Sequence, residues 1–250
     1  MNMVVVSDRG QIRQLNEDFA EIVKNESNQV LAVVADGMGG HKAGDVASFM
    51  AASTLKEEFI NKQSFTTAEE AENWLKTFIQ KANDNILTHA KNNASCEGMG
   101  TTIVATIITD QFATIAHVGD SRCYLKSDAG FVQITNDHSL VYELMKTGQI
   151  SKEEAEIHPM KNVVLRSVGT DEVVKIDIST IILEPNNYLL LCSDGLSNKL
   201  NDKEMNEVLE MSTSLEDKAN QLIHLANDYG GEDNITVAII HYSPIDGGYK

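Results

Sequence analysis

The sequence predicts one α+β domain in which neighbouring strands run antiparallel. Two segments with helical spacing stand together early in the chain, a run of short strand-like segments follows, and helical spacing returns near the end. A parallel sheet would require strands and helices in regular alternation. Short polar turns between consecutive strand-like segments are typical of antiparallel hairpins. We therefore expect residues 1–250 to form a single α+β domain.

The expected strands are short, apolar and rich in β-branched side chains. Polar turns at 109–111 and 127–130 join successive strands and predict two hairpins. Alternation of apolar and polar residues adds a further candidate over 173–183. The full set of strand-like segments is 30–35, 101–109, 112–118, 121–125, 131–135, 173–183, 188–192 and 235–241.

The expected helices have apolar residues three and four positions apart. The longer of the two early helices begins at Thr67, where Glu70 three residues later completes a capping box. Ser151 and Glu154 have the same spacing and predict the start of a short helix. The segments with helical spacing are 44–60, 67–91, 201–211 and 214–229, besides the short one at 151–154.

Charge and composition exclude several classes of function. Lys and Arg number 20 while Asp and Glu number 37, so the formal net charge is −17. Nucleic acids and anionic membrane surfaces are bound through a basic face, and we therefore expect neither as a partner. Apolar residues make up 42% of the chain, enough to build a buried core. General disorder is thereby excluded.

Cysteine usage and the N-terminal sequence predict a cytoplasmic location. Cys96, Cys123 and Cys192 are odd in number, far apart and without a CxxC pair. Reduced thiols explain this pattern more simply than a disulfide framework does. The N-terminal apolar run ends at Val6 and has no basic leader, unlike a secretion signal. No stretch reaches the roughly 18 to 20 apolar residues of a membrane-spanning helix.

Acidic residues adjoin four expected strands, each beside a glycine or an asparagine. Buried carboxylates cost free energy unless an opposite charge neutralises them. Arg122 follows one of these acids at two positions, but no basic residue lies that close to the other three. Carboxylates with carbonyl and water oxygens favour Mg²⁺ or Mn²⁺, whereas Zn²⁺ prefers His and Cys. The four acids are Asp36, Asp120, Asp194 and Asp233.

Each acid also has a purely structural interpretation, because Asp-Gly after a strand is a common turn. Their number, and the glycine-rich run at 36–41, favour a shared cation site. Two neighbouring cations can activate water for the hydrolysis of a phosphate ester. Arg13, just before the acidic pair Glu17-Asp18, is a candidate to bind the phosphate, because a guanidinium can hold two oxygens at once. Alternatively, Arg13 is a surface residue paired with an acid.

Eight motifs, in order along almost the whole chain, carry a family resemblance. They are SDRGQIRQLNED (7–18), VVADGMGGHKAGDVAS (33–48), GMGTT (98–102), HVGDSRCYL (117–125), TNDHSL (135–140), LRSVGT (165–170), LLLCSDGLSN (190–198) and GEDNITVAII (231–240). Together they resemble the bacterial type 2C metal-dependent serine/threonine protein phosphatases, the PPM family. The combination of DGMGGH with the distant SDG and DNITV is the most specific part.

The resemblance implies a four-layer α-β-β-α sandwich, with two antiparallel sheets flanked by helices and the metals at one end. It implies that Asp36 bridges two metals and that the Gly37 carbonyl binds the second. Asp194 and Asp233 would complete the protein ligands of the first metal. Asp18 would orient water on the second metal. The expected cofactors are two core Mn²⁺ or Mg²⁺ ions.

Other positions receive roles through the same resemblance. Asp120 matches the position that binds a third, weaker metal, and Arg13 matches the arginine that grips the phosphate. His41 matches a histidine that is a candidate general acid for the departing seryl or threonyl oxygen, although a loop histidine with only a structural hydrogen bond is an alternative. Residues from about 138 to 166 resemble the mobile flap of the family.

The implied activity is hydrolysis of phosphoserine and phosphothreonine in proteins, by attack of water activated at a Mn/Mg centre. Phosphorylated proteins are the expected substrates, and a bacterial Ser/Thr kinase is the expected functional counterpart. A haloacid-dehalogenase-type hydrolase is one alternative, but it would need Asp-x-Asp after its first strand, whereas Gly-Met follows Asp36. A metal-stabilised module that binds phosphoproteins without cleaving them is the other.

Overall fold

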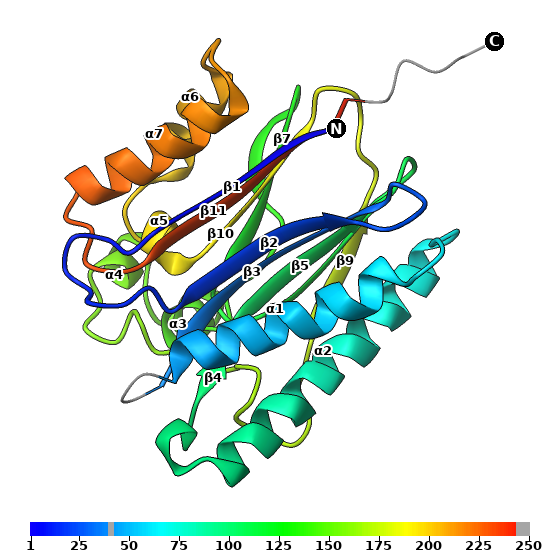
Figure 1. Ribbon diagram of the computed structural model, residues 1–250. Coiled ribbons are helices and arrows are strands. Elements are labelled where there is room, and N and C mark those ends of the chain that lie inside the picture. Colours follow the sequence, from blue (N-terminus) through cyan, green and yellow to red (C-terminus); the bar gives the residue numbers. More distant parts are fainter. Residues whose placement is uncertain (40–42, 244–250) are drawn as a thin grey trace.

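Two antiparallel sheets pack face to face between two pairs of helices (Figure 1). The structure, a computed structural model, describes residues 1–39 and 43–243. Helices α6 (Asp202–Glu210) and α7 (Leu215–Asp228) cover one outer face, and α1 (Gly44–Ile60) and α2 (Ala68–Asn92) cover the other. The four-layer arrangement expected from the sequence is therefore confirmed.

Every strand pair in both sheets is antiparallel. The first sheet has the order β1 (Asn2–Asp8), β11 (Ile235–His241), β10 (Tyr188–Cys192), β7 (Arg122–Ser127) and β8 (Gly130–Gln133). The second has the order β2 (Asp18–Lys24), β3 (Val30–Met38), β5 (Ile103–Ile108), β6 (Ala113–Val118) and β9 (Asp177–Ile181), with β4 (Gly100–Thr101) beside β3. The hairpins expected at 109–111 and 127–130 join β5 to β6 and β7 to β8.

Strand β3 shows why its sequence is continuously apolar. Val30, Ala32 and Val34 point into the core between the sheets, where they meet residues of β10 and β11. Leu31 and Val33 point the other way, into the core beneath α1 and α2. Both faces of the strand are therefore buried. Consecutive side chains point to opposite faces, and for this reason they are all apolar.

Several elements differ from the sequence expectations. Strands β1 and β2 were not expected: residues 1–6 were considered only as a possible secretion signal, which they do not resemble, and no strand was predicted at 18–24. The short helices α3 (Leu140–Lys146) and α5 (Asp194–Ser197) and the 3₁₀ turn η1 (Ala94–Cys96) were also missed. Of the segment 173–183, only Asp177–Ile181 forms a strand.

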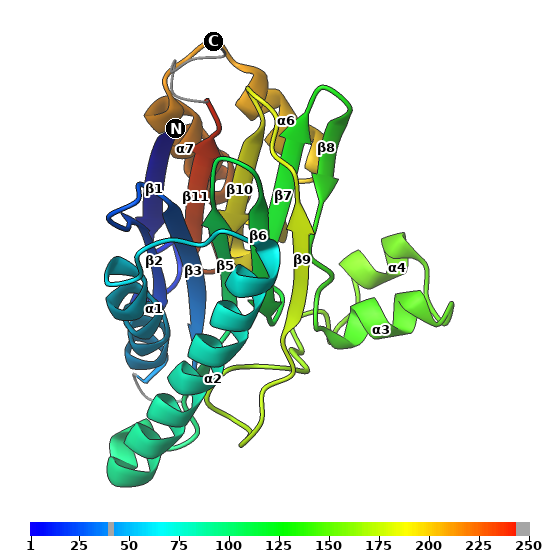
Figure 2. The same ribbon diagram turned by 90° about the vertical axis from the view of Figure 1, so that its right-hand side faces the viewer.

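Helices α3 and α4 (Lys152–Glu156) stand beside the sandwich rather than within its layers (Figure 2). They belong to the flap-like segment expected at about 138–166. The ends of this segment are joined to each other: Leu165 N donates to His138 O at 2.7 Å, and Leu140 N donates to Val163 O at 2.9 Å. Within residues 1–39 and 43–243, none of the helices combines the length and apolar character that a membrane span requires.

Candidate metal centre

The two sheets bring the predicted acids to one end of the sandwich. In the second sheet, Asp18 at the start of β2 lies directly opposite Asp36 near the end of β3. In the first sheet, β10 and β11 are antiparallel neighbours, so the residues that follow Cys192 lie beside those that precede Ile235. Asp194 and Asp233 therefore lie at the same end of this sheet.

Ser193 connects the two sheets at this end. Its hydroxyl donates to Asp18 Oδ2 at 2.7 Å and accepts from Thr236 N at 3.0 Å. No role was predicted for Ser193, although it lies inside the SDG motif. Its hydrogen bonds fix the distance between Asp18 of one sheet and the neighbours of Asp194 and Asp233 in the other.

The carboxylates of the predicted acids lie close enough to act on one another electrostatically. Burial, followed by the charges of the other four acids, raises the pKa of Asp36 well above its usual value. Burial is also the main cause that raises the pKa of Asp18 to about 7 and that of Asp194 to about 6, and neighbouring carboxylates add to both shifts. We call the five residues Asp18, Asp36, Asp120, Asp194 and Asp233 the acid cluster.

Asp120 belongs to the cluster through the turn that follows β6. It is buried, and burial followed by the charge of Asp194 raises its pKa to about 7. Gly119 beside it has a φ of +108°, and a Cβ there would lie 2.6 Å from Thr102 Cβ. Only glycine therefore lets this turn pass so close to Thr102.

The oxygen atoms of the acid cluster suit a hard divalent cation. Asp18 Oδ1 and Asp194 Oδ1 are buried and have no hydrogen-bond partner among the described residues. A buried carboxylate oxygen without a donor is costly, and a bound cation removes that cost. Because the donor set consists of oxygen atoms, it fits Mg²⁺ or Mn²⁺.

Close backbone packing surrounds Gly37. A Cβ at residue 37 would lie 2.1 Å from Gly44 O and 2.5 Å from Glu17 O. Glu17 is thus a neighbour of this site that the sequence analysis had noted only as part of an acidic pair, and burial raises its pKa. Thr102 holds the preceding residue in place: its hydroxyl accepts from Asp36 N at 3.0 Å and its N–H donates to Asp36 O at 2.9 Å.

Arg13 reaches the edge of the acid cluster. Its Nη2 donates to Asp233 Oδ2 at 2.8 Å, and its side chain is 46% exposed. Asn234 fastens the loop that carries Arg13, because its Nδ2 donates to Leu15 O at 2.9 Å and its Oδ1 accepts from Glu17 N at 2.8 Å. Asn234 had no predicted role, although it follows Asp233 in the DNITV motif. His41 lies outside the described residues.

A second group of ionisable side chains lies at the ends of the flap-like segment and joins two buried histidines to two partly exposed partners. We call it the flap-root cluster: His117, His138, Arg166 and Asp177. Donor atoms of the two histidines and Asp177 lie within 4.8 Å of one another, a grouping that could hold a metal. Here the cation is Arg166, whose Nη1 lies 2.8 Å from Asp177 Oδ1 and 2.9 Å from His138 Nε2. Burial, His117 and Arg166 together lower the pKa of His138 to about 4.

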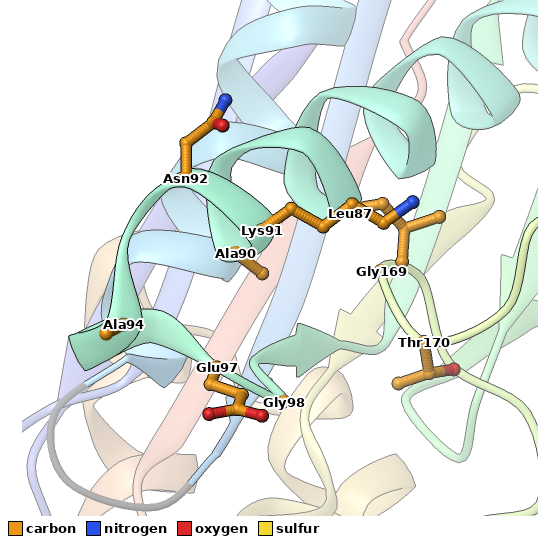
Figure 3. Close-up of a pocket in the computed structure, with 9 residues that line it drawn as sticks. All are labelled: Leu87, Ala90, Lys91, Asn92, Ala94, Glu97, Gly98, Gly169 and Thr170. Carbon is orange, nitrogen blue, oxygen red and sulfur yellow. The ribbon is translucent and has the colours of Figure 1, made fainter.

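A surface hollow of about 650 Å³ lies elsewhere, at the C-terminal end of α2 (Figure 3). It is lined by residues at the end of α2, among them Leu87 and Lys91, by Glu97, and by Gly169 and Thr170. None of the described members of the predicted site lines it. The acid cluster is therefore a separate feature of the surface.

Comparison with known proteins identifies close relatives. The family model described as Protein phosphatase 2C matches residues 9–230. The chain is 47% identical to the serine/threonine phosphatase stp of Listeria monocytogenes, over 94% of this chain and 93% of that one. It is 39% identical to the protein phosphatase PhpP of Streptococcus pneumoniae, over 98% of this chain and 99% of that one.

Solved structures of serine/threonine phosphatases also superpose closely on this chain. The serine/threonine phosphatase of S. agalactiae superposes with a TM-score of 0.92 at 38% identity, covering 97% of this chain and 99% of that chain. The catalytic domain of the serine/threonine protein phosphatase PstP, solved in complex with two manganese ions, superposes with a TM-score of 0.86 at 31% identity, covering 97% and 98%.

Proposed function

Since this chain belongs to the protein phosphatase 2C family and is a metal-dependent serine/threonine protein phosphatase, we propose that the acid cluster is its catalytic metal centre. Phosphorylated proteins are its substrates. The observation that carries the proposal is the convergence of five acids at one end of the sandwich: the charges of the other four raise the pKa of Asp36, and two buried carboxylate oxygens lack a donor among the described residues.

We assign two core ions to this centre. Asp36 would bridge them, with the Gly37 carbonyl on the second ion and Asp194 and Asp233 on the first. Asp18 would orient water on the second ion, an assignment supported by its place opposite Asp36. When bound, Mn²⁺ or Mg²⁺ lowers the pKa of water and neutralises charge on the phosphoryl group. We assign a third, weaker ion to Asp120, whose burial beside Asp194 supports it.

Arg13 is the proposed phosphate-binding residue. Its guanidinium stands at the rim of the acid cluster and contacts Asp233 from solvent, so it can turn toward a substrate phosphate without crossing the core. A guanidinium can bind two phosphate oxygens, which orients the phosphoryl group. We also propose His41 as the group that protonates the leaving seryl or threonyl oxygen, on the strength of the DGMGGH motif alone.

We also propose that residues 1–250 act as one phosphatase domain, with the segment at about 138–166 as its flap. The core between the sheets, to which strands of both contribute, supports this. A cytoplasmic location is supported by three free, buried cysteines, since disulfides persist mainly in oxidising compartments. A bacterial Ser/Thr kinase that phosphorylates the same substrates is the proposed counterpart.

The assignment is tested by Asp36→Asn and Asp233→Asn, each of which keeps the side-chain shape but removes a charge. Both should lose hydrolysis of a phosphothreonine peptide and bind Mn²⁺ more weakly in calorimetry. Asp128→Asn, in the turn after β7, is the matched control and should behave as the wild type. Wild-type Mn²⁺ affinity in both variants would show that the acid cluster is not the metal site.

A further inference from the structure

Arg122 is the basic residue nearest to the acid cluster in the sequence, two positions after Asp120. It also lies directly opposite Cys192 in the sheet, two positions before Asp194. Its charge lowers the pKa of both Asp120 and Asp194, although burial outweighs this effect. A guanidinium at this place could neutralise these two carboxylates in competition with a metal ion.

The Arg122 guanidinium instead forms an ion pair with Asp137. Arg122 Nε lies 2.9 and 3.1 Å from the two carboxylate oxygens of Asp137, and Nη2 lies 2.6 Å from Oδ2. Nη1 donates to Tyr124 OH at 3.0 Å. Each guanidinium nitrogen therefore has a partner outside the acid cluster, and the Arg122–Asp137 pair has no net charge.

The residues on both sides of Asp137 are bound to the turn that carries Asp120. His117 Nε2 lies at hydrogen-bond distance, 2.8 Å, from Asn136 O. His138 N donates to Gly119 O at 2.9 Å, and His138 Nδ1 accepts from Gly119 N at 3.1 Å. Asp137 is thus held in a fixed place relative to Asp120, which keeps Arg122 in its observed orientation.

We propose that Asp137 is a positioning residue of the metal centre: it holds Arg122 away from Asp120 and Asp194 and cancels its charge, so that these carboxylates stay available to a divalent cation. The inference rests on the proposed role of the acid cluster. Asp137 acts through Arg122 and not through contact with the substrate.

Removing the charge of Asp137 tests this directly. Asp137→Asn should weaken Mn²⁺ binding at the Asp120 site about tenfold in calorimetry, because an unpaired positive charge then remains beside the carboxylates. Adding Arg122→Gln to Asp137→Asn should restore most of the affinity. Glu210→Gln removes the partner of Lys126, another residue of β7, and as a matched control should bind Mn²⁺ as the wild type does.

Two substitutions of Arg122 give a second test that leaves Asp137 intact. Both Arg122→Lys and Arg122→Gln lose the two-pronged contact with Asp137, but only the lysine keeps a positive charge that can swing toward Asp120. We expect weaker Mn²⁺ binding for Arg122→Lys only. A purely structural role would weaken binding in both variants equally. Thermal unfolding in EDTA reports whether each protein is folded.

The inference is overturned if Asp137→Asn binds Mn²⁺ like the wild type, or if the double variant is as weak as Asp137→Asn alone. Failure of the underlying site looks different. If Asp36→Asn leaves Mn²⁺ binding unchanged, the acid cluster itself is misassigned. If Asp36→Asn abolishes binding while Asp137→Asn does not alter it, only the role of Asp137 is wrong.

Discussion

The acid cluster and the flap-root cluster each combine buried and partly exposed ionisable side chains, and their charges are neutralised in different ways. In the flap-root cluster, burial alone would raise the pKa of Asp177, but hydrogen bonds from His138 and Arg166 lower it. The acid cluster has cations only at its margin, Arg13 on Asp233 and Arg122 near Asp120, and burial together with the other four acids raises the pKa of Asp36 well above its usual value. The first cluster is complete as folded, whereas the second requires a cation from solution.

The largest expected difference between the clusters concerns catalysis. Asp36→Asn should lower turnover of a phosphothreonine peptide about 1,000-fold or more, because it removes a ligand charge from the metal centre. Asp177→Asn removes an equal charge from the flap-root cluster and should lower turnover less than about tenfold. Equal loss of activity in both variants, measured in single-turnover assays at saturating Mn²⁺, would contradict this difference between the clusters.

Metal addition should stabilise the fold only through the acid cluster. Mn²⁺ at 100 times its dissociation constant should raise the free energy of unfolding by about 3 kcal/mol per site. Arg166→Ala should keep this gain, whereas Asp36→Asn should lose most of it. Urea unfolding with Mn²⁺ and with EDTA measures both. Equal gains in the two variants would mean that the stabilising ion binds elsewhere.

The pH dependence of the metal-free protein follows from the raised pKa values. Asp18 and Asp120 have a pKa of about 7 and Asp194 of about 6, whereas an aspartate in the unfolded chain titrates near about 4. Between about pH 4 and 7 these carboxyl groups hold more protons in the folded than in the unfolded state, so their contribution to the free energy of unfolding falls as the pH rises. The lowered pKa of His138 opposes this trend, but the acids outnumber it.

Urea unfolding in EDTA from pH 5 to 8 tests this decline. Saturating Mn²⁺ should reverse it, because metal ligands bind in their deprotonated form and metal affinity rises with pH. Metal-free stability that increases through this window would contradict the raised pKa values of Asp18, Asp120 and Asp194.

The sequence predicted most of the fold because its core strands are strongly apolar. The segments 188–192 and 235–241 coincide with β10 and β11. Strand β2 was missed because it is an edge strand with one half-exposed face, and its sequence DFAEIVK mixes charges with apolar residues. Helix α5 has only four residues, Asp194–Ser197, too few to show a helical period.

The acid cluster could be predicted for two reasons. Acids at strand ends without nearby basic residues need a cation, and the motifs that contain these acids occur in the same order as in the family they resemble. The residues that support the cluster could not be predicted from the sequence in the same way. Ser193, Thr102 and Asn234 act through hydrogen bonds to residues 66 to 219 positions away in the sequence. Only the packing of the two sheets brings such partners together.

The smallest expected difference concerns the arginines of the two clusters. Arg166→Ala should lower the free energy of unfolding by about 2 kcal/mol, because it leaves Asp177 and His138 without their cation in a partly buried place. Arg13→Ala removes an exposed pair with Asp233 and should cost less than about 1 kcal/mol. Its effect should instead appear in catalysis, as a KM for phosphopeptide raised about tenfold. Calorimetric Mn²⁺ affinity should remain at the wild-type value in Arg13→Ala, and an equal loss of metal binding would place Arg13 in the metal centre rather than at the substrate phosphate.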